Sequence, residues 1–138
     1  MQARRVSLFA VAVALMPASP AVRAQPAPQA VIPQQVSCVG EEPFWGFDAN
    51  RTTGDLHRPG GKARQTVEFR GELLAIPFLA PKALVWRGNS TRLPAETLVA
   101  TLREESCSST MKEGPPREWR AILSTRPGEA LTGCCTVK

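Results

Sequence analysis

From residue 36 onward, apolar and polar residues alternate along much of the chain, which is the pattern of half-buried β-strands. No window carries apolar residues at a sustained helical spacing. Most of the alternating or β-prone stretches end in residues that favour turns. The strands that this pattern predicts are 44–47, 66–72, 83–86, 97–103, 118–125 and 130–137. The chain is therefore expected to be all-β.

Three segments fit the alternation less well. Residues 73–79 are apolar but include Pro77, which cannot donate to a ladder, so we expect an edge strand or a crossing loop. Residues 53–61 are rich in Gly, Pro and Asp and predict turns, and residues 106–116 predict a long loop. Six or seven short strands with frequent turns indicate a small antiparallel meander, either a partly closed barrel or a sandwich.

The first 24 residues have the features of a secretory signal peptide. A basic pair at residues 4–5 precedes an apolar run at residues 6–16, and small residues precede a cleavage point after residue 24. The apolar run is shorter than the about 20 residues that span a bilayer. We therefore expect export by the Sec or the Tat route, with no stable membrane span after cleavage.

Two further regions follow the signal peptide. Residues 25–35 are Pro, Gln and Ala with little else and predict a disordered spacer, and residues 36–138 predict the β domain. The full chain carries 17 Lys and Arg against 12 Asp and Glu, but three arginines leave with the signal, so the mature chain has 14 against 12. This near balance and the absence of a basic run predict no nucleic-acid partner.

The β domain contains four cysteines, which are Cys38, Cys107, Cys134 and Cys135. In a small exported chain they predict two disulfides and an oxidising compartment. A bridge between the neighbours Cys134 and Cys135 would strain the backbone. On a strand these two side chains point to opposite faces, so each can take a different partner. We favour Cys107–Cys134 and Cys38–Cys135, and the swapped pairing stays open.

Three short motifs surround these cysteines. A Cys-x-Gly-x-Glu-Pro-Phe-Trp block covers Cys38–Trp45, a Cys-x-x-x-Met loop covers Cys107–Met111, and a Gly-Cys-Cys motif covers Gly133–Cys135. With them the chain resembles a family of uncharacterised bacterial envelope proteins, sometimes associated with META-type domains. The resemblance implies a periplasmic or secreted protein with a β-rich fold and no established activity. The loop departs from the family because Ser108–Thr110 stand where an acidic residue is usual.

The candidate site is the block formed by Glu42, Pro43, Phe44 and Trp45. In the structural interpretation, which we favour, Phe44 and Trp45 pack into the core, Pro43 sets the strand entry and Glu42 accepts backbone hydrogen bonds. In the functional interpretation, Trp45 is a platform and Glu42 a polar anchor for a ligand or a partner. The other two tryptophans are also expected in the core.

The sequence shows no catalytic constellation. His57 is the only histidine and is expected in a solvated turn without a partner. We predict a non-catalytic envelope domain of binding or structural type, without cofactor or metal, whose ligand or partner is unknown. The alternative is a periplasmic metal-binding or thiol-redox protein, in which Cys107, Met111, Cys134 and Cys135 hold Cu(I) when reduced.

Overall fold

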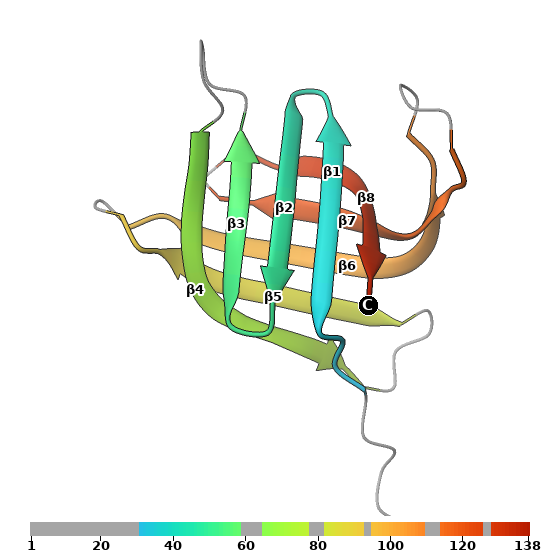
Figure 1. Ribbon diagram of the computed structural model, residues 1–138, viewed down its shortest axis with the longest axis horizontal. Coiled ribbons are helices and arrows are strands. Elements are labelled where there is room, and N and C mark those ends of the chain that lie inside the picture. The colour runs from blue at the N-terminus through green and yellow to red at the C-terminus, as the bar shows by residue number, and fades with distance from the viewer. Residues whose placement is uncertain (1–30, 59–64, 78–81, 93–94, 110–113, 126–127) are drawn as a thin grey trace, which may run out of the picture.

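The structure is a computed structural model in which eight β-strands form one closed antiparallel barrel (Figure 1). It describes residues 31–58, 65–77, 82–92, 95–109, 114–125 and 128–138. The strands are β1 Gln35–Glu41, β2 Phe44–Asn50, β3 Thr53–Arg58, β4 Gln65–Ile76, β5 Ala83–Ser90, β6 Thr97–Cys107, β7 Arg117–Ser124 and β8 Leu131–Val137. The all-β, disulfide-braced meander is confirmed, with eight strands instead of six or seven, and β1 pairs with β8 to close the barrel.

The two strands absent from the prediction are β1 and β3. The inward positions of β1 are Val36, Cys38 and Gly40, and two of these residue types give only a weak strand signal. In β3, Gly54 and Leu56 face inward, and the strand pairs with β2 on one side and β4 on the other. Tertiary pairing on both sides thus outweighs the turn preference of the Gly and Asp residues.

β4 does not end where the alternation predicts. It continues as one strand of 12 residues through Leu73 to Ile76, and Pro77 follows directly after it, so the expected edge strand or crossing loop is wrong over this part. Residues 78–81, the end of that segment and the residues after it, lie outside the described residues. Gly71 permits the continuation because a Cβ there would lie only 2.7 Å from Gly88 Cα on β5. β4 curves along its length from one layer into the other (Figure 1).

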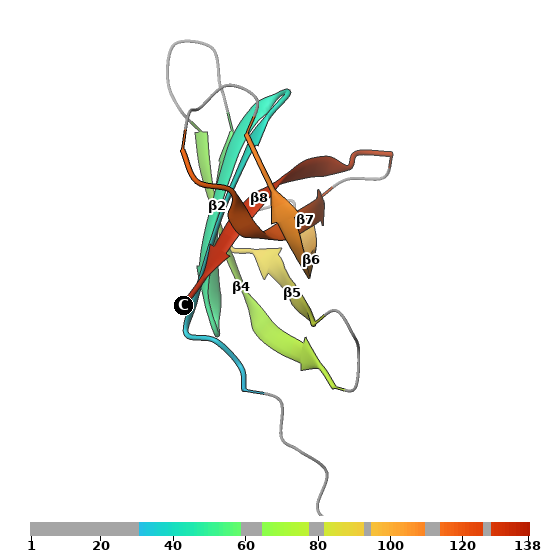
Figure 2. The same ribbon diagram turned by 90° about the vertical axis from the view of Figure 1, so that its right-hand side faces the viewer.

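The strands form two layers. β1, β2, β3 and the first part of β4 stand upright in Figure 1, and β5, β6 and β7 run across behind them. Figure 2 shows the two layers from the side. Large side chains fill the space between them, and the fully buried ones include Trp86, Phe47, Phe69, Leu56, Leu98, Leu102 and Leu123. The barrel is therefore packed and holds its core where a wider barrel would hold a ligand.

The aromatic side chains divide between the core and the surface. All three tryptophans are buried, as expected, and Trp86 donates a hydrogen bond from Nε1 to the Asn50 carbonyl at 3.0 Å. The prediction that Phe44 packs into the core is wrong, because its side chain is 57% exposed. Phe44 and Trp45 are successive residues of β2, and only one of them can face the same side as Phe47.

A polar cluster links β3 to the crossing layer. Arg58 donates from Nη2 to Thr125 Oγ1 and to Glu129 Oε2, the latter at 3.3 Å. Its Nη1 lies 3.9 Å from Glu96 Oε2, and Thr125 Oγ1 donates to Glu129 Oε2 at 2.7 Å. The Arg58 side chain is largely buried, so these contacts compensate a charge that has left water. They join segments about half the chain length apart.

Candidate functional site

The two disulfides lie on opposite sides of the barrel wall. Cys38–Cys135 joins directly opposite residues of β1 and β8, with a Cα–Cα distance of 4.0 Å, and both residues belong to the core. Cys107–Cys134 joins the end of β6 to β8, with a Cα–Cα distance of 5.4 Å, outside that core. This is the pairing that the sequence favours. Alternation along β8 places one sulfur on each face.

The outer disulfide is flanked by two hollows, which together we call the disulfide groove. The larger hollow has a volume of about 570 Å³ and the smaller one about 290 Å³. Both are lined by Val39, Cys107, Ser109 and Cys134. The larger one is also lined by Gly114, Pro115, Pro116, Arg117, Glu118, Thr136, Val137 and Lys138, and the smaller one by Gly40, Glu41, Glu42, Ser108, Arg120, Thr132 and Gly133.

The smaller hollow gathers residues from all three motifs. Gly40–Glu42 come from the first block, Cys107–Ser109 from the loop, and Gly133–Cys134 from the C-terminal motif. β1 and β8 meet through the barrel closure, and the outer disulfide brings the end of β6 to the same place. Three segments far apart in the chain therefore share one surface.

Trp45 lies on the inner side of this surface. The β1–β8 ladder ends at Val39 and Cys134, and beyond it the indole packs against Gly40 and Gly133. A Cβ on Gly133 would lie 2.7 Å from Trp45 Cζ2, and a Cβ on Gly40 would lie 2.6 Å from Trp45 Cδ1. Only glycines leave room for the ring at these two positions. Trp45 thus supports the groove from the core and is not a platform within it.

Negative charge predominates in the smaller hollow. Glu41 accepts a hydrogen bond from Ser109 Oγ, and Glu42 is exposed and makes no hydrogen bond or ion pair within the described part of the chain. Arg120 points to Glu105, with 3.1 Å between its Nε and Glu105 Oε1. Because this arginine is already compensated, the hollow is acidic. Glu42 was expected to accept hydrogen bonds from backbone N–H groups, and within the described ranges it accepts none.

Arg117 and Arg120 are groove residues that the sequence analysis missed. Arg120 is the ladder partner of Cys134, and Arg117 is the ladder partner of Cys107. Arg117 Nη1 also donates to the carbonyls of Ser37 and Cys134, each at 3.3 Å. The alternation predicted the strand that includes Arg120, but the sequence carries no signal for which neighbouring strand lies beside it.

The expectation that His57 lies in a solvated turn without a partner is wrong. It lies on β3, its Nδ1 is 3.0 Å from Thr66 Oγ1 on β4, and its Nε2 is 3.5 Å from Asp48 Oδ2 on β2. A hydroxyl, an imidazole and a carboxylate in contact are the groups of a nucleophilic triad. Here they lie on three neighbouring strands of the sheet, β2, β3 and β4. We interpret them as cross-strand contacts that stabilise the sheet.

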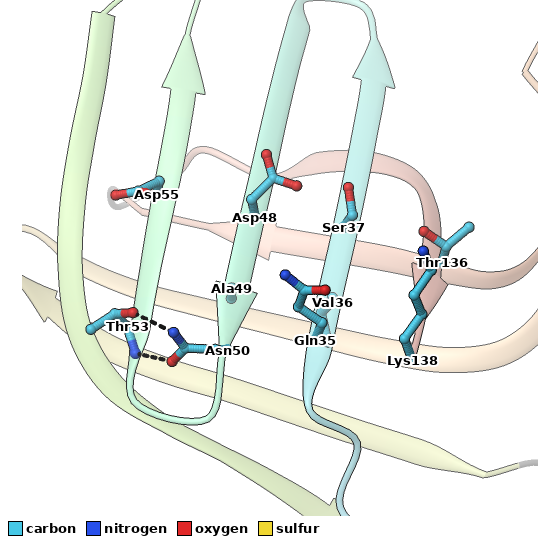
Figure 3. Close-up of a pocket in the computed structure, with 10 residues that line it drawn as sticks. All are labelled: Gln35, Val36, Ser37, Asp48, Ala49, Asn50, Thr53, Asp55, Thr136 and Lys138. Carbon is cyan, nitrogen blue, oxygen red and sulfur yellow. Dashed lines mark hydrogen bonds between the residues drawn. The ribbon is translucent and has the colours of Figure 1, made fainter.

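A second pocket, of about 440 Å³, lies over the upright layer (Figure 3). Asp48 and Asp55 are ladder partners across β2 and β3, and both side chains are exposed there. Asn50 accepts hydrogen bonds from the backbone N–H groups of Thr52 and Thr53 and so closes the turn between these strands. No residue of the three motifs lines this pocket, so it is a weaker candidate than the disulfide groove.

The copper hypothesis does not fit the positions of its ligands. Cys134 and Cys135 point to opposite faces of the wall and both are in disulfides, and Met111 lies outside the described residues. Within the described ranges, no group of three or more His, Cys, Asp or Glu side chains is placed to hold a metal ion. The same ranges contain no helix long and apolar enough to cross a membrane.

The chain matches no protein-family model, no curated protein and no solved structure. The resemblance to bacterial envelope proteins therefore stays a prediction. The site rests on its geometry alone.

Proposed function

We propose that the protein is an exported, non-catalytic binding domain of the bacterial envelope, and that its ligand occupies the disulfide groove. The observation that carries this proposal is the convergence of the three motifs on the smaller hollow. The barrel interior is filled by side chains, so a ligand has to bind on the outer wall. A purely structural role for the motifs would require their buried residues alone, yet Glu42 is exposed at the edge of the hollow.

The lining of the groove suggests the kind of ligand. The larger hollow presents apolar atoms of Val39, Pro115, Pro116 and Val137, and the smaller one presents the carboxylates of Glu41 and Glu42. The two hollows lie on either side of one disulfide, so a ligand that fills both has to be extended. We infer an extended peptide segment of a partner protein, with apolar residues in the larger hollow and a basic residue beside Glu42.

A peptide titration of the isotopically labelled protein tests this proposal. The probe is the acetylated peptide Leu-Pro-Leu-Lys-Lys, and the control peptide carries Glu in place of both Lys residues. We expect saturable NMR shift changes centred on Val39, Glu42 and Cys134 with the basic peptide only. Because an exposed ion pair contributes about 0.2–1 kcal/mol, Glu42→Gln should weaken binding by about threefold.

Glu68→Gln is the matched control variant. Glu68 is also an exposed carboxylate, but it lies on β4, on the upright layer and outside the groove. Its removal should leave the Kd of the basic peptide unchanged. Equal binding of both peptides, or shift changes confined to the Asp48–Asp55 pocket, would contradict the assignment of the groove.

A further inference from the structure

We propose that Cys107–Cys134 is an exchangeable disulfide, opened by the dithiol of a partner protein, and that its opening joins the two hollows of the groove. Cys38–Cys135 stays oxidised throughout and keeps the barrel closed. This inference rests on the proposed function, because it assigns a control to the same binding site. It goes beyond that function by naming a reaction of the outer disulfide.

The two bridges differ in location. Cys38 and Cys135 belong to the core, so a reductant reaches them only when the barrel opens. Cys107 and Cys134 are also buried, at 3% and 7% exposed, but both line the two outer hollows. A thiol that enters the groove therefore meets the outer bridge without any opening of the barrel.

The barrel wall separates the two disulfides. Cys134 and Cys135 are adjacent in the chain, but their sulfurs lie outside and inside the barrel. A thiolate formed on Cys134 cannot reach the inner bridge while β8 stays paired with β1 and β7. Opening of the outer disulfide is thus not expected to spread to the inner one by exchange.

The two sulfurs of the outer bridge differ in how firmly their residues are held. Cys134 is held by ladders on both sides of β8 and is the more exposed of the two residues. Cys107 is the last residue of β6, follows a register shift that begins at Glu104 and pairs on one side only, which suits it to be the leaving group. Arg117, its ladder partner, places a positive charge in the same hollow, which favours a leaving thiolate.

The reaction balances as two exchanges. A thiolate of the partner attacks Cys134 Sγ, the Cys107–Cys134 bond breaks, and Cys107 leaves as a thiolate that takes up a proton. The second thiol of the partner then attacks the first partner sulfur in the mixed disulfide. Cys134 is released as a thiolate, which takes up a proton. The partner ends oxidised to a disulfide, and the outer pair ends reduced.

The consequence for the groove follows from what separates its hollows. Cys107 and Ser109 line both hollows, and the disulfide fixes this segment against β8. After reduction, no covalent bond holds this segment against β8, and Ser109 donates a hydrogen bond to Glu41 on β1. A ligand in the groove can displace noncovalent contacts of this kind more easily than a covalent bond. We therefore expect tighter ligand binding in the reduced form.

The test is a graded reduction of the full oxidised protein with dithiothreitol, followed by alkylation and mass-spectrometric mapping of the cysteines. We expect a stage at which Cys107 and Cys134 are alkylated while Cys38 and Cys135 are still protected. The circular dichroism spectrum should stay that of the folded protein at this stage. Simultaneous alkylation of all four cysteines, or earlier alkylation of the inner pair, would overturn the proposal.

The Leu-Pro-Leu-Lys-Lys peptide then separates this inference from the proposed function. Its Kd is measured on the oxidised protein and on the selectively reduced, alkylated protein. A lower Kd after reduction supports the control of the groove, and an unchanged Kd overturns it. No binding in either state overturns the proposed function, while the cysteine mapping still decides whether the outer disulfide exchanges.

Discussion

Replacement of Gly40 by alanine tests the central packing contact of the site. An added Cβ would lie 2.6 Å from Trp45 Cδ1 and still closer to Nε1 and Cε2 of the same ring. Real Cβ atoms essentially never lie closer than 3.0 Å to another heavy atom, so the indole would have to move. The ring is rigid and has Gly133 beside it, within contact of a Cβ built there. The strain has to be taken up by the core.

The expected cost follows from two limits. Overpacking of a well-filled core costs about 1–3 kcal/mol. Complete expulsion of the indole would cost about as much as a Trp→Ala change, which is about 3–5 kcal/mol. Since Trp45 is only 5% exposed and contacts both glycines, we expect Gly40→Ala to lower the free energy of unfolding by about 3 kcal/mol. That is a large part of the about 5–15 kcal/mol of a typical domain.

The assay is guanidinium unfolding followed by tryptophan fluorescence and circular dichroism. Gly114→Ala is the matched control, because a Cβ there meets nothing within 4 Å, and it should change the unfolding free energy by less than about 0.5 kcal/mol. In a Trp45→Ala background, Gly40→Ala should cost less than about 1 kcal/mol, because its clash is gone. A loss below about 1 kcal/mol for the single Gly40→Ala variant would refute the packing argument.

Two further comparisons test the fold with paired variants. Trp45→Ala should lower the free energy of unfolding by about 3–5 kcal/mol, whereas Phe44→Ala, at an exposed position of the same strand, should change it by less than about 1 kcal/mol in guanidinium unfolding. Arg58→Met should cost about 2–3 kcal/mol because it removes hydrogen bonds of a largely buried guanidinium to Thr125 and Glu129. Its control, Arg87→Met, removes an exposed ion pair and should cost at most about 1 kcal/mol in the same assay. Equal stability of these two variants would contradict the role of Arg58.

The alternation of residues predicted the strands in which it was strongest. β6 and β7 each place three apolar side chains inward at every second position. β7 was expected within one residue of its observed bounds, whereas β6 runs past the expected end at residue 103 to Cys107, into part of the expected loop. β1 and β3 were missed because Gly40, Gly54 and Cys38 occupy inward positions. A small residue gives no hydrophobic signal, and at Gly40 and Gly54 it is needed because a tryptophan or phenylalanine ring fills the space.

The site was visible in the sequence only as separate motifs. The alternation along β8 placed Cys134 and Cys135 on opposite faces and so gave each a different partner, but it left the observed and the swapped pairing both open. It could not place Phe44, because two adjacent aromatic residues give no indication of which one faces inward. The sequence also did not predict the partners of His57, because Asp48 and Thr66 lie on neighbouring strands and only the strand pairing brings them next to it.

The sequence by itself determined that this chain is all-β and that Cys134 and Cys135 take different partners, because both depend on the two-residue period of a strand. Only the tertiary structure decided that the barrel closes and that the motifs at Gly40, Cys107 and Gly133 line one groove. The physical reason is that a strand's own sequence sets its two faces but not its neighbours. Neighbours are chosen by ladder register and by the fit of Trp45 against glycines on two other strands.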